Sequence, residues 1–276
     1  MIVPVARDAV FVAQVRRAMQ DRDVLTIWWV GQSGFLVHYD GVCIALDPYL
    51  SDSLTEKYAQ TAKPHVRLSE RVVDPALLDM VSLVTSSHNH TDHLDAQTCI
   101  ALAKANPALR LACSAANVPF ARERMGPSFP ALIALTEDVP FVHGPFTLHV
   151  VPAAHNDVTR DAAGNLAAIG LVIEVGGKVL YHSGDTLRYD GMAERLRHWR
   201  CDAALLPING NDPARGVAGN LSAAEAVALG RDIDARVVVP CHYDMFAFNT
   251  ADPAEFVRAA GSPGHVMQLG ESLTIR

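Results

Sequence analysis

The pattern of apolar residues at the start of the chain changes from helical to extended. Apolar residues at mostly helical spacing predict an amphipathic helix over residues 8–21. Short runs of β-branched and aromatic residues then predict strands over residues 24–30, 34–39 and 42–46. The Asp40-Gly41 pair between the last two runs is typical of a two-residue hairpin turn. The chain is therefore expected to open with a helix and a β-meander.

From Asp74 onward, helices and strands are expected to alternate. Asp74 followed by Pro75 is a typical helix start, and further helices are predicted after Asp95 and from Ser114. The apolar runs between them predict strands over residues 81–85 and 109–113. This order indicates α/β units.

The second half of the chain repeats this order. Its apolar runs predict strands over residues 146–151, 168–175, 178–182, 203–208, 237–240 and 272–275. Gly176-Gly177 predicts a second hairpin turn, Ser222 with Glu225 forms a capping-box pattern, and Asp252-Pro253 predicts a last helix start. Two β-rich regions, each followed by α/β units, predict a single domain over residues 1–276. We expect an α/β four-layer αββα sandwich with two mixed sheets face to face and helices outside.

Composition narrows the class of protein. Half of the 276 residues are hydrophobic and 19% are charged, which excludes a disordered chain. Lys and Arg number 23 against 30 Asp and Glu, and the net charge of −7 argues against a nucleic-acid surface. No apolar run approaches the ~18 residues of a membrane span, and the N-terminus shows no targeting pattern. We expect a cytoplasmic protein with a small-molecule substrate and no nucleic-acid or membrane partner, and homo-oligomerisation stays open.

The five cysteines do not suggest a disulfide framework. They are scattered without a Cys-x-x-Cys pair, and an odd number is typical of reduced thiols. We interpret them as core residues. Cys241 precedes His242, and we expect it to fill space beside the site described next.

The strongest chemical signal is a histidine-rich segment between a predicted strand and a predicted helix. His88, His90, Asp92 and His93 place four metal ligands within six residues. Imidazole and carboxylate suit Zn²⁺, Mn²⁺ and Fe²⁺, and the absence of Cys argues against a closed structural zinc site. The pattern therefore predicts an open, catalytic metal centre.

One loop cannot coordinate two ions by itself, so further ligands should come from other strand ends. His155, Asp185 and His242 each follow a predicted apolar strand. Active sites of layered α/β folds collect at such strand ends. The remaining histidines have no ligand-like context and are interpreted as surface or core residues: His38, His65, His143, His149, His198 and His265.

These residues together resemble the metallo-β-lactamase-fold hydrolases. The His-x-His-x-Asp-His signature of that family matches residues 88–93, and its later His, Asp and His match His155, Asp185 and His242. The resemblance implies two divalent ions, Zn²⁺ or Mn²⁺: His88, His90 and His155 would hold the first, Asp92, His93 and His242 the second, and Asp185 would bridge them. Segments 27–34, 181–185 and 235–244 are also similar to the L-ascorbate-6-phosphate lactonase group.

The resemblance implies hydrolysis by a hydroxide that the two ions share. Two such ions lower the pKa of water toward ~7 and polarise the oxygen under attack, with Asp92 and Asp185 as the catalytic carboxylates. We expect a lactonase that acts on a small polar, in some cases phosphorylated, substrate. The alternatives are a phosphodiesterase of the same fold and a non-catalytic metal-binding protein.

Several neighbouring residues receive weaker assignments. Asp47 is interpreted as a carboxylate that orients a ligand histidine, with a turn-forming role before Pro48 as the alternative. His182 is expected to support Asp185 or the strand that it ends. Four residues are candidate substrate contacts, with a solvated loop as the alternative for the first three: Asn209, Asn211, Arg215 and Tyr243. Tyr189 and Asn156 are weaker candidates for the same role.

Overall fold

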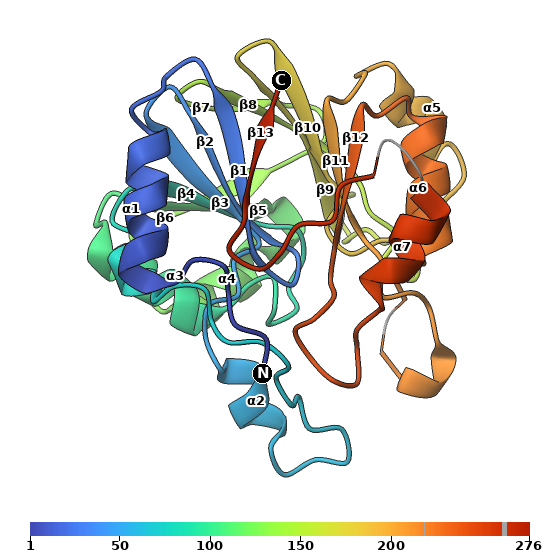
Figure 1. Cartoon of the computed structure of the whole chain (residues 1–276), viewed down its shortest axis with the longest axis horizontal. Coiled ribbons are helices and arrows are strands. Elements are labelled where there is room, and N and C mark those ends of the chain that lie inside the picture. The colour runs from blue at the N-terminus through green and yellow to red at the C-terminus, as the bar shows by residue number, and fades with distance from the viewer. Residues whose placement is uncertain (218, 261–263) are drawn as a thin grey trace.

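A computed structural model describes residues 1–217, 219–260 and 264–276 and shows two mixed β-sheets with helices on their outer faces (Figure 1). The predicted αββα sandwich is confirmed. One cluster of buried apolar side chains includes residues of both sheets, among them Trp28, Leu83, Leu171 and Leu205. In the described residues, no helix combines the length and the apolar character that crossing a membrane requires.

The first sheet contains seven strands and begins with the predicted meander. Their order is β13 (Ser272–Ile275), β1 (Leu25–Gly31), β2 (Gly34–Tyr39), β3 (Val42–Leu46), β4 (Val81–Ser86), β5 (Arg110–Ser114) and β6 (Ala131–Leu135). Strands β1, β2 and β3 are antiparallel neighbours, whereas β3 to β6 are parallel. The helices on this side of the sandwich are α1 (Asp8–Ala18), α3 (Ala96–Ala105) and α4 (Val118–Met125) (Figure 1).

The second sheet contains six strands. Their order is β12 (Val237–Cys241), β11 (Ala203–Pro207), β10 (Lys178–His182), β9 (Ile169–Val175), β8 (Phe146–Pro152) and β7 (Phe141–His143). Strands β10, β11 and β12 are parallel, and β9 is antiparallel to both of its neighbours. The helices on this side are α5 (Met192–Arg197), α6 (Ala223–Asp232) and α7 (Pro253–Ala260) (Figure 1).

This topology decides where the candidate ligands lie. Strands β3 and β4 are parallel, so the segments that follow them leave the first sheet at the same end of the strands. Strands β8, β10, β11 and β12 share one direction, because β9 reverses the chain between β8 and β10. The loops that carry the predicted site residues therefore meet at one end of the sandwich.

Local turn and capping signals are confirmed. Asp40 and Gly41 both have positive φ, as do Gly176 and Gly177, which is the backbone form of a twisted two-residue hairpin. Ser222 and Glu225 form the complete capping box at the start of α6, and the Asp95 side chain caps α3 by accepting from Thr98 N. Each of these signals depends only on neighbours in the sequence, which is why a pattern can find them.

The predicted helix after Asp74 is wrong in extent. Asp74 caps only the single 3₁₀ turn η1 (Pro75–Leu77), because Leu78 leaves the helical region and the chain enters β4 at Val81. The helix expected from Ser114 also begins as a 3₁₀ turn, η2 (Ala115–Asn117), before α4. A further 3₁₀ turn, η3 (Pro213–Arg215), follows β11.

Among the described residues, two α-helices and two strands have no counterpart in the sequence prediction. They are α2 (Ser53–Tyr58), β6, β7 and α5. The two strands lie at the outer ends of their sheets, and their side chains are mostly only half-buried. Helix α2 has six residues and belongs to a segment that extends beyond the sandwich (Figure 1). Elements of three to six residues are too short to show a clear period.

Candidate metal centre

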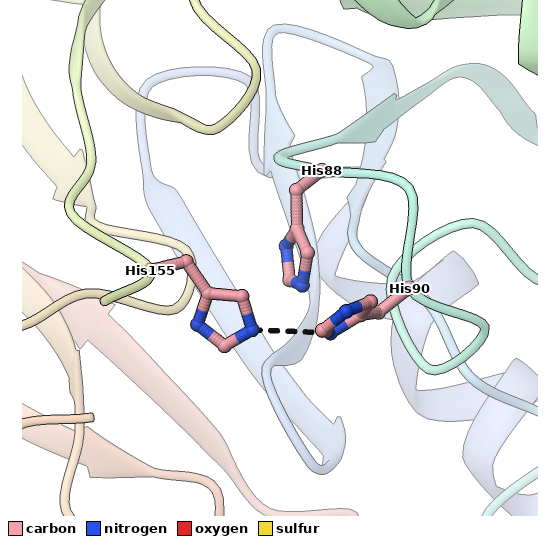
Figure 2. Close-up of side chains that lie close together, drawn as sticks. All are labelled: His88, His90 and His155. Carbon is pink, nitrogen blue, oxygen red and sulfur yellow. Dashed lines mark hydrogen bonds between the residues drawn. The ribbon is translucent and has the colours of Figure 1, made fainter. Parts of the chain in front are cut away.

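Three imidazoles from two loops converge at the end of the sandwich. His88 and His90 lie on the loop between β4 and α3, and His155 lies on the segment after β8 (Figure 2). Each offers one nitrogen, and these nitrogens lie within 4.8 Å of one another. His90 Nδ1 and His155 Nε2 are 3.0 Å apart. This spacing is suitable for a shared ion.

A second group lies beside the first. Asp92, His93 and His242 also offer ligand atoms within 4.8 Å of one another. Asp185 lies between the two groups: its Oδ1 is 3.3 Å from His93 Nε2, and its Oδ2 is 3.4 Å from His242 Nε2. His88, His93 and Asp185 form a third set within the same limit. The structure thus brings all seven predicted ligands together.

The backbone is strained at the ends of two strands, where the chain enters the site. Asp47 after β3 and His242 after β12 have φ of +41° and +63°, a region that non-glycine residues rarely adopt. His242 N donates to Gln32 O at 3.0 Å, which ties the end of β12 to the turn between β1 and β2. Such outliers collect at functional sites, where the surrounding structure maintains them.

Burial and neighbouring charges shift the pKa values of the site histidines in opposite directions. Burial lowers the pKa of His155 to about 4 and holds that of His88 well below its ordinary value. These imidazoles are therefore neutral at pH 7 and keep a lone pair for an ion. Burial alone would also lower the pKa of His93, but the carboxylates of Asp185 and Asp92 raise it well above the usual range.

The two site carboxylates remain ionised. Burial would raise the pKa of Asp185, but the adjacent His93 and His242 hold it well below its ordinary value. The pKa of Asp92 is also lowered: burial opposes ionisation, and His93, His242 and the Gln32 hydrogen bond together outweigh burial. The centre therefore presents negative charge where a divalent cation would lie.

Asp47 lies directly behind the histidine-rich loop. Its Oδ2 is 2.6 Å from His93 Nδ1, and both side chains are fully buried. Ser87 donates to the same carboxylate from its backbone N at 2.9 Å and from its hydroxyl. With Nδ1 bound to Asp47, the Nε2 of His93 faces Asp185 and Asp92. This arrangement is typical of a carboxylate that orients a metal-binding imidazole.

Unpartnered nitrogens test whether these residues fit a metal. Among the described residues, nothing forms a hydrogen bond with His88 Nε2 or His93 Nε2, although both atoms are buried. Buried polar atoms without a partner are costly in a folded protein. Nitrogen and carboxylate donors at this spacing suit a borderline divalent cation. The residues present therefore fit the predicted ions.

Two buried residues near Asp185, His182 and Cys241, contact Ser33 and do not line the cavity over the candidate ligands. His182 Nε2 lies 2.9 Å from Ser33 O, and Ser33 Oγ donates to Asp185 Oδ1 at 3.4 Å. His182 therefore reaches Asp185 only through Ser33. Cys241 Sγ lies 3.9 Å from Ser33 Oγ, and burial raises the pKa of this thiol well above its ordinary value.

Gln32 is a site residue that the sequence prediction missed. Its Nε2 donates to Asp92 Oδ2 at 2.8 Å and lies 3.1 Å from His242 Nε2. The available signal was a polar pair, Gln32-Ser33, that interrupts two apolar strands between Gly31 and Gly34. That pattern is common in solvated turns, whereas the folded chain buries both side chains.

A cavity of about 570 Å³ opens over the candidate ligands, and the predicted substrate contacts are not among its lining residues. Tyr243 is buried, stacks on Trp29 with ring centroids 4.4 Å apart and donates to Met267 O. Asn211 is exposed outside the lining. Asn209 donates to Asn249 Oδ1 at 2.9 Å, and only Asn249 reaches the cavity.

The other residues with that weak assignment also bond to the protein rather than line the cavity. Arg215 donates to the backbone O of Asn209. Tyr189 donates to Pro152 O at 3.0 Å, and Asn156 Oδ1 accepts from Gly219 N at 2.9 Å. Other residues line the cavity instead, and several of them come from the segment around α2.

Comparisons with known proteins identify the family of this chain. A family model described as "Beta-lactamase superfamily domain" matches residues 44–243. The chain is 29% identical over 256 residues to a metal-dependent hydrolase of Caldivirga maquilingensis, covering 90% of this chain and 96% of the relative. It is 24% identical over 266 residues to the "Probable L-ascorbate-6-phosphate lactonase UlaG" of Escherichia coli O127:H6, covering 83% of this chain and 72% of the relative.

A solved structure shows the same fold. Igni18, described as a metallo hydrolase of the archaeon Ignicoccus hospitalis, has a TM-score of 0.66 and 24% sequence identity to this chain. The superposition covers 92% of this chain and 99% of that one. At this identity, the likeness extends to the arrangement of the sheets and helices.

Proposed function

Because the chain belongs to the beta-lactamase superfamily, we propose that it is a metal-dependent hydrolase, and specifically a lactonase that opens a carboxylic-ester ring. The observation that carries the proposal is the convergence of seven ligand side chains in three overlapping sets, each within 4.8 Å. The relatives named metal-dependent hydrolase and L-ascorbate-6-phosphate lactonase support the same class of reaction.

The proposed centre holds two divalent ions, Zn²⁺ or Mn²⁺. His88, His90 and His155 would hold one ion, Asp92, His93 and His242 the other, and Asp185 would contact both. Such ions, when bound, lower the pKa of water and polarise a carbonyl or phosphoryl oxygen. The purified protein should then contain close to two equivalents of metal.

Two carboxylates of the chain, Asp92 and Asp185, would take part in proton transfer and in positioning. Asp92 lines the cavity and receives the Gln32 amide hydrogen bond on its Oδ2, which keeps the carboxylate oriented and ionised. It can accept the proton of an attacking water from that position. Asp185 also lines the cavity, and Ser33 and the neighbouring histidines fix its two oxygens. Neither Ser33 nor Cys241 lines the cavity as a nucleophile.

The test is a panel of substrates measured with metal-reconstituted protein. Lactones and phosphodiesters are assayed side by side, before and after treatment with a chelator and after re-addition of Zn²⁺ or Mn²⁺. We expect lactone hydrolysis that chelation abolishes and metal restores, and a loss of several orders of magnitude in Asp92→Ala. Hydrolysis of phosphodiesters alone would favour the alternative activity, and chelator-resistant turnover would contradict the metal mechanism.

A further inference from the structure

The cavity over the candidate metal centre has walls of distinct chemistry. Its floor consists of predicted ligands, namely His90, Asp92, His155, Asp185 and His242. The remaining lining comes largely from residues 53–68, which we call the α2 segment, from residues 246–249 after β12 and from residues 216–217. These segments are far apart in the sequence and meet only in the folded chain.

One wall is aromatic. The ring of His65 stacks on Tyr58 with centroids 4.3 Å apart and an interplanar angle of 23°. Phe246 and Phe248 approach His65 edge-on at 5.1 Å and 4.6 Å. All four side chains line the cavity, and Tyr58, His65 and Phe248 are only half-buried. We call these four residues the aromatic wall.

The aromatic wall is built before a substrate arrives. Leu68 N donates to Met245 O at 2.8 Å and Ala247 N donates to Val66 O at 2.9 Å, so the α2 segment and the segment after β12 pair along their backbones. Burial lowers the pKa of His65, and its ring is therefore a neutral flat surface at pH 7. Preorganised walls reduce the entropy lost on binding.

The charges above the metal floor have one sign. Lys57, Lys63 and Arg124 line the cavity, whereas its acidic lining residues are Asp92 and Asp185 of the metal floor. Within the described part of the chain, none of these three cations forms an ion pair. The whole chain carries a net charge of −7, so this positive region is a local feature. A cavity lined by one charge attracts ligands of the opposite sign.

Arg124 is partly committed to structure. Its Nη1 donates to Asn89 O and Leu94 O at 2.9 Å and 3.0 Å, so it holds both ends of the histidine-rich loop. Lys63 Nζ donates to Arg215 O. Lys57 lies 5.1 Å from the centre of the Tyr58 ring, which places a cation beside the aromatic wall.

We propose that the substrate is an organic anion with an aromatic or otherwise flat unsaturated body. Resting on the proposed hydrolase function, this inference places the flat body on the aromatic wall, the negative group near Lys57 and Lys63, and the scissile bond over the metal floor. The aromatic wall would recognise the flat body by ring-on-ring packing. The two lysines, which form no ion pair in the described part of the chain, would recognise the negative group. A substrate covered in hydroxyl groups would find few hydrogen-bond partners on that wall.

The inference is tested by binding rather than by turnover. Isothermal titration calorimetry of the metal-loaded protein compares phenylacetate, acetate and phenylacetamide, which carry ring and charge, charge alone, and ring alone. We expect phenylacetate to bind about tenfold tighter than either other probe. Its affinity should fall as salt increases, because the lysines are exposed.

Variants separate the two features. Phe248→Ala should weaken phenylacetate about tenfold and leave acetate unchanged, and Phe248→Leu, which keeps the apolar volume, protects the test against misfolding. Lys63→Gln should weaken phenylacetate about threefold and leave phenylacetamide unchanged. Lys104→Gln, on the exposed side of α3, is the matched control and should change nothing.

The outcomes distinguish this inference from the proposed function. Selective phenylacetate binding in a protein that hydrolyses no ester would support the inference and refute the hydrolase. Lactone hydrolysis by a protein that binds all three probes equally, with no effect of Phe248→Ala, would overturn the inference and leave the hydrolase intact.

Discussion

At the scale of single residues, the Asp47 carboxylate connects two parts of the metal centre. Asp47 accepts hydrogen bonds from Ser87 and lies 2.6 Å from His93 Nδ1, so one carboxylate fixes both the loop backbone and an imidazole. Asn tolerates the positive φ of this position. An amide has only one accepting oxygen, so it cannot accept from Ser87 N and from His93 Nδ1 through two oxygens as the carboxylate does.

We therefore expect Asp47→Asn to fold and to lose metal affinity by about 10–100-fold. Affinity is measured by competition with a chromogenic chelator, and folding by circular dichroism. Asp79→Asn, an exposed carboxylate paired with Arg16, is the control. Unchanged metal content in Asp47→Asn would make this residue a turn former only.

The second prediction at this scale concerns Cys241. Its thiol is buried, its pKa is raised by burial, and it lies outside the cavity lining. A thiol of this kind is not a nucleophile at pH 7. Cys241→Ser should leave turnover largely unchanged, and an alkylating reagent should modify the thiol only after unfolding. Mass spectrometry of native and denatured protein after alkylation measures this, and stoichiometric inactivation of the native protein would indicate covalent catalysis.

At the scale of elements, capping determines where α6 begins. Ser222 Oγ accepts from Glu225 N at 3.3 Å, and Glu225 Oε2 accepts from Ser222 N at 2.8 Å. Ser222→Ala removes one half of this pair and should lower the free energy of unfolding by about 1 kcal/mol. Urea unfolding measures the change, with the exposed Ser128→Ala as control. Equal stability of the two variants would show that the cap contributes nothing.

The α2 segment shows the limit of pattern reading at this scale. Its helix has six residues, of which only Leu54 is buried, so no periodicity reveals it. Yet Tyr58 and His65 of this segment form half of the aromatic wall. The histidine lacked a ligand-like context in sequence, and its partners Phe246 and Phe248 lie in the last part of the chain.

At the scale of the whole molecule, the two sheets meet beside the metal centre. Ser87 follows β4 of the first sheet and Gly184 follows β10 of the second. A Cβ at Gly184 would lie 2.5 Å from Ser87 Cβ and 3.0 Å from Ile169 O, and the φ of Gly184 is +60°. The absence of a side chain lets the loop of Asp185 approach the loop of His88.

Gly184→Ala should therefore push the two halves of the site apart. Left-handed backbone costs about 1–2 kcal/mol, and overpacking about 1–3 kcal/mol more. Gly177→Ala is the matched control, because its φ is +72° and nothing lies within 4 Å of the added atom. We expect Gly184→Ala to lose more unfolding free energy than the control and to lose metal affinity as well. Equal losses in both variants would show that the loops can move apart without cost.

The sequence by itself determined the local features of this protein. Asp40-Gly41 and Gly176-Gly177 predicted their hairpins, and Ser222 with Glu225 predicted the capping box, because each depends on neighbours along the chain. The order of strands and helices predicted the sandwich. Four of the seven candidate ligands lie in one segment of six residues, so their spacing was visible without a fold.

Only the tertiary structure decided which side chains face the cavity. Tyr243 follows a predicted ligand by one residue but packs on Trp29, whereas Gln32 reaches Asp92 across 60 positions. Sequence neighbours at a strand end point to opposite sides, and residues from distant segments become neighbours only when the sheets pack. The orientation of Asp47 toward His93 and the assembly of the aromatic wall arise from that packing, which no local pattern records.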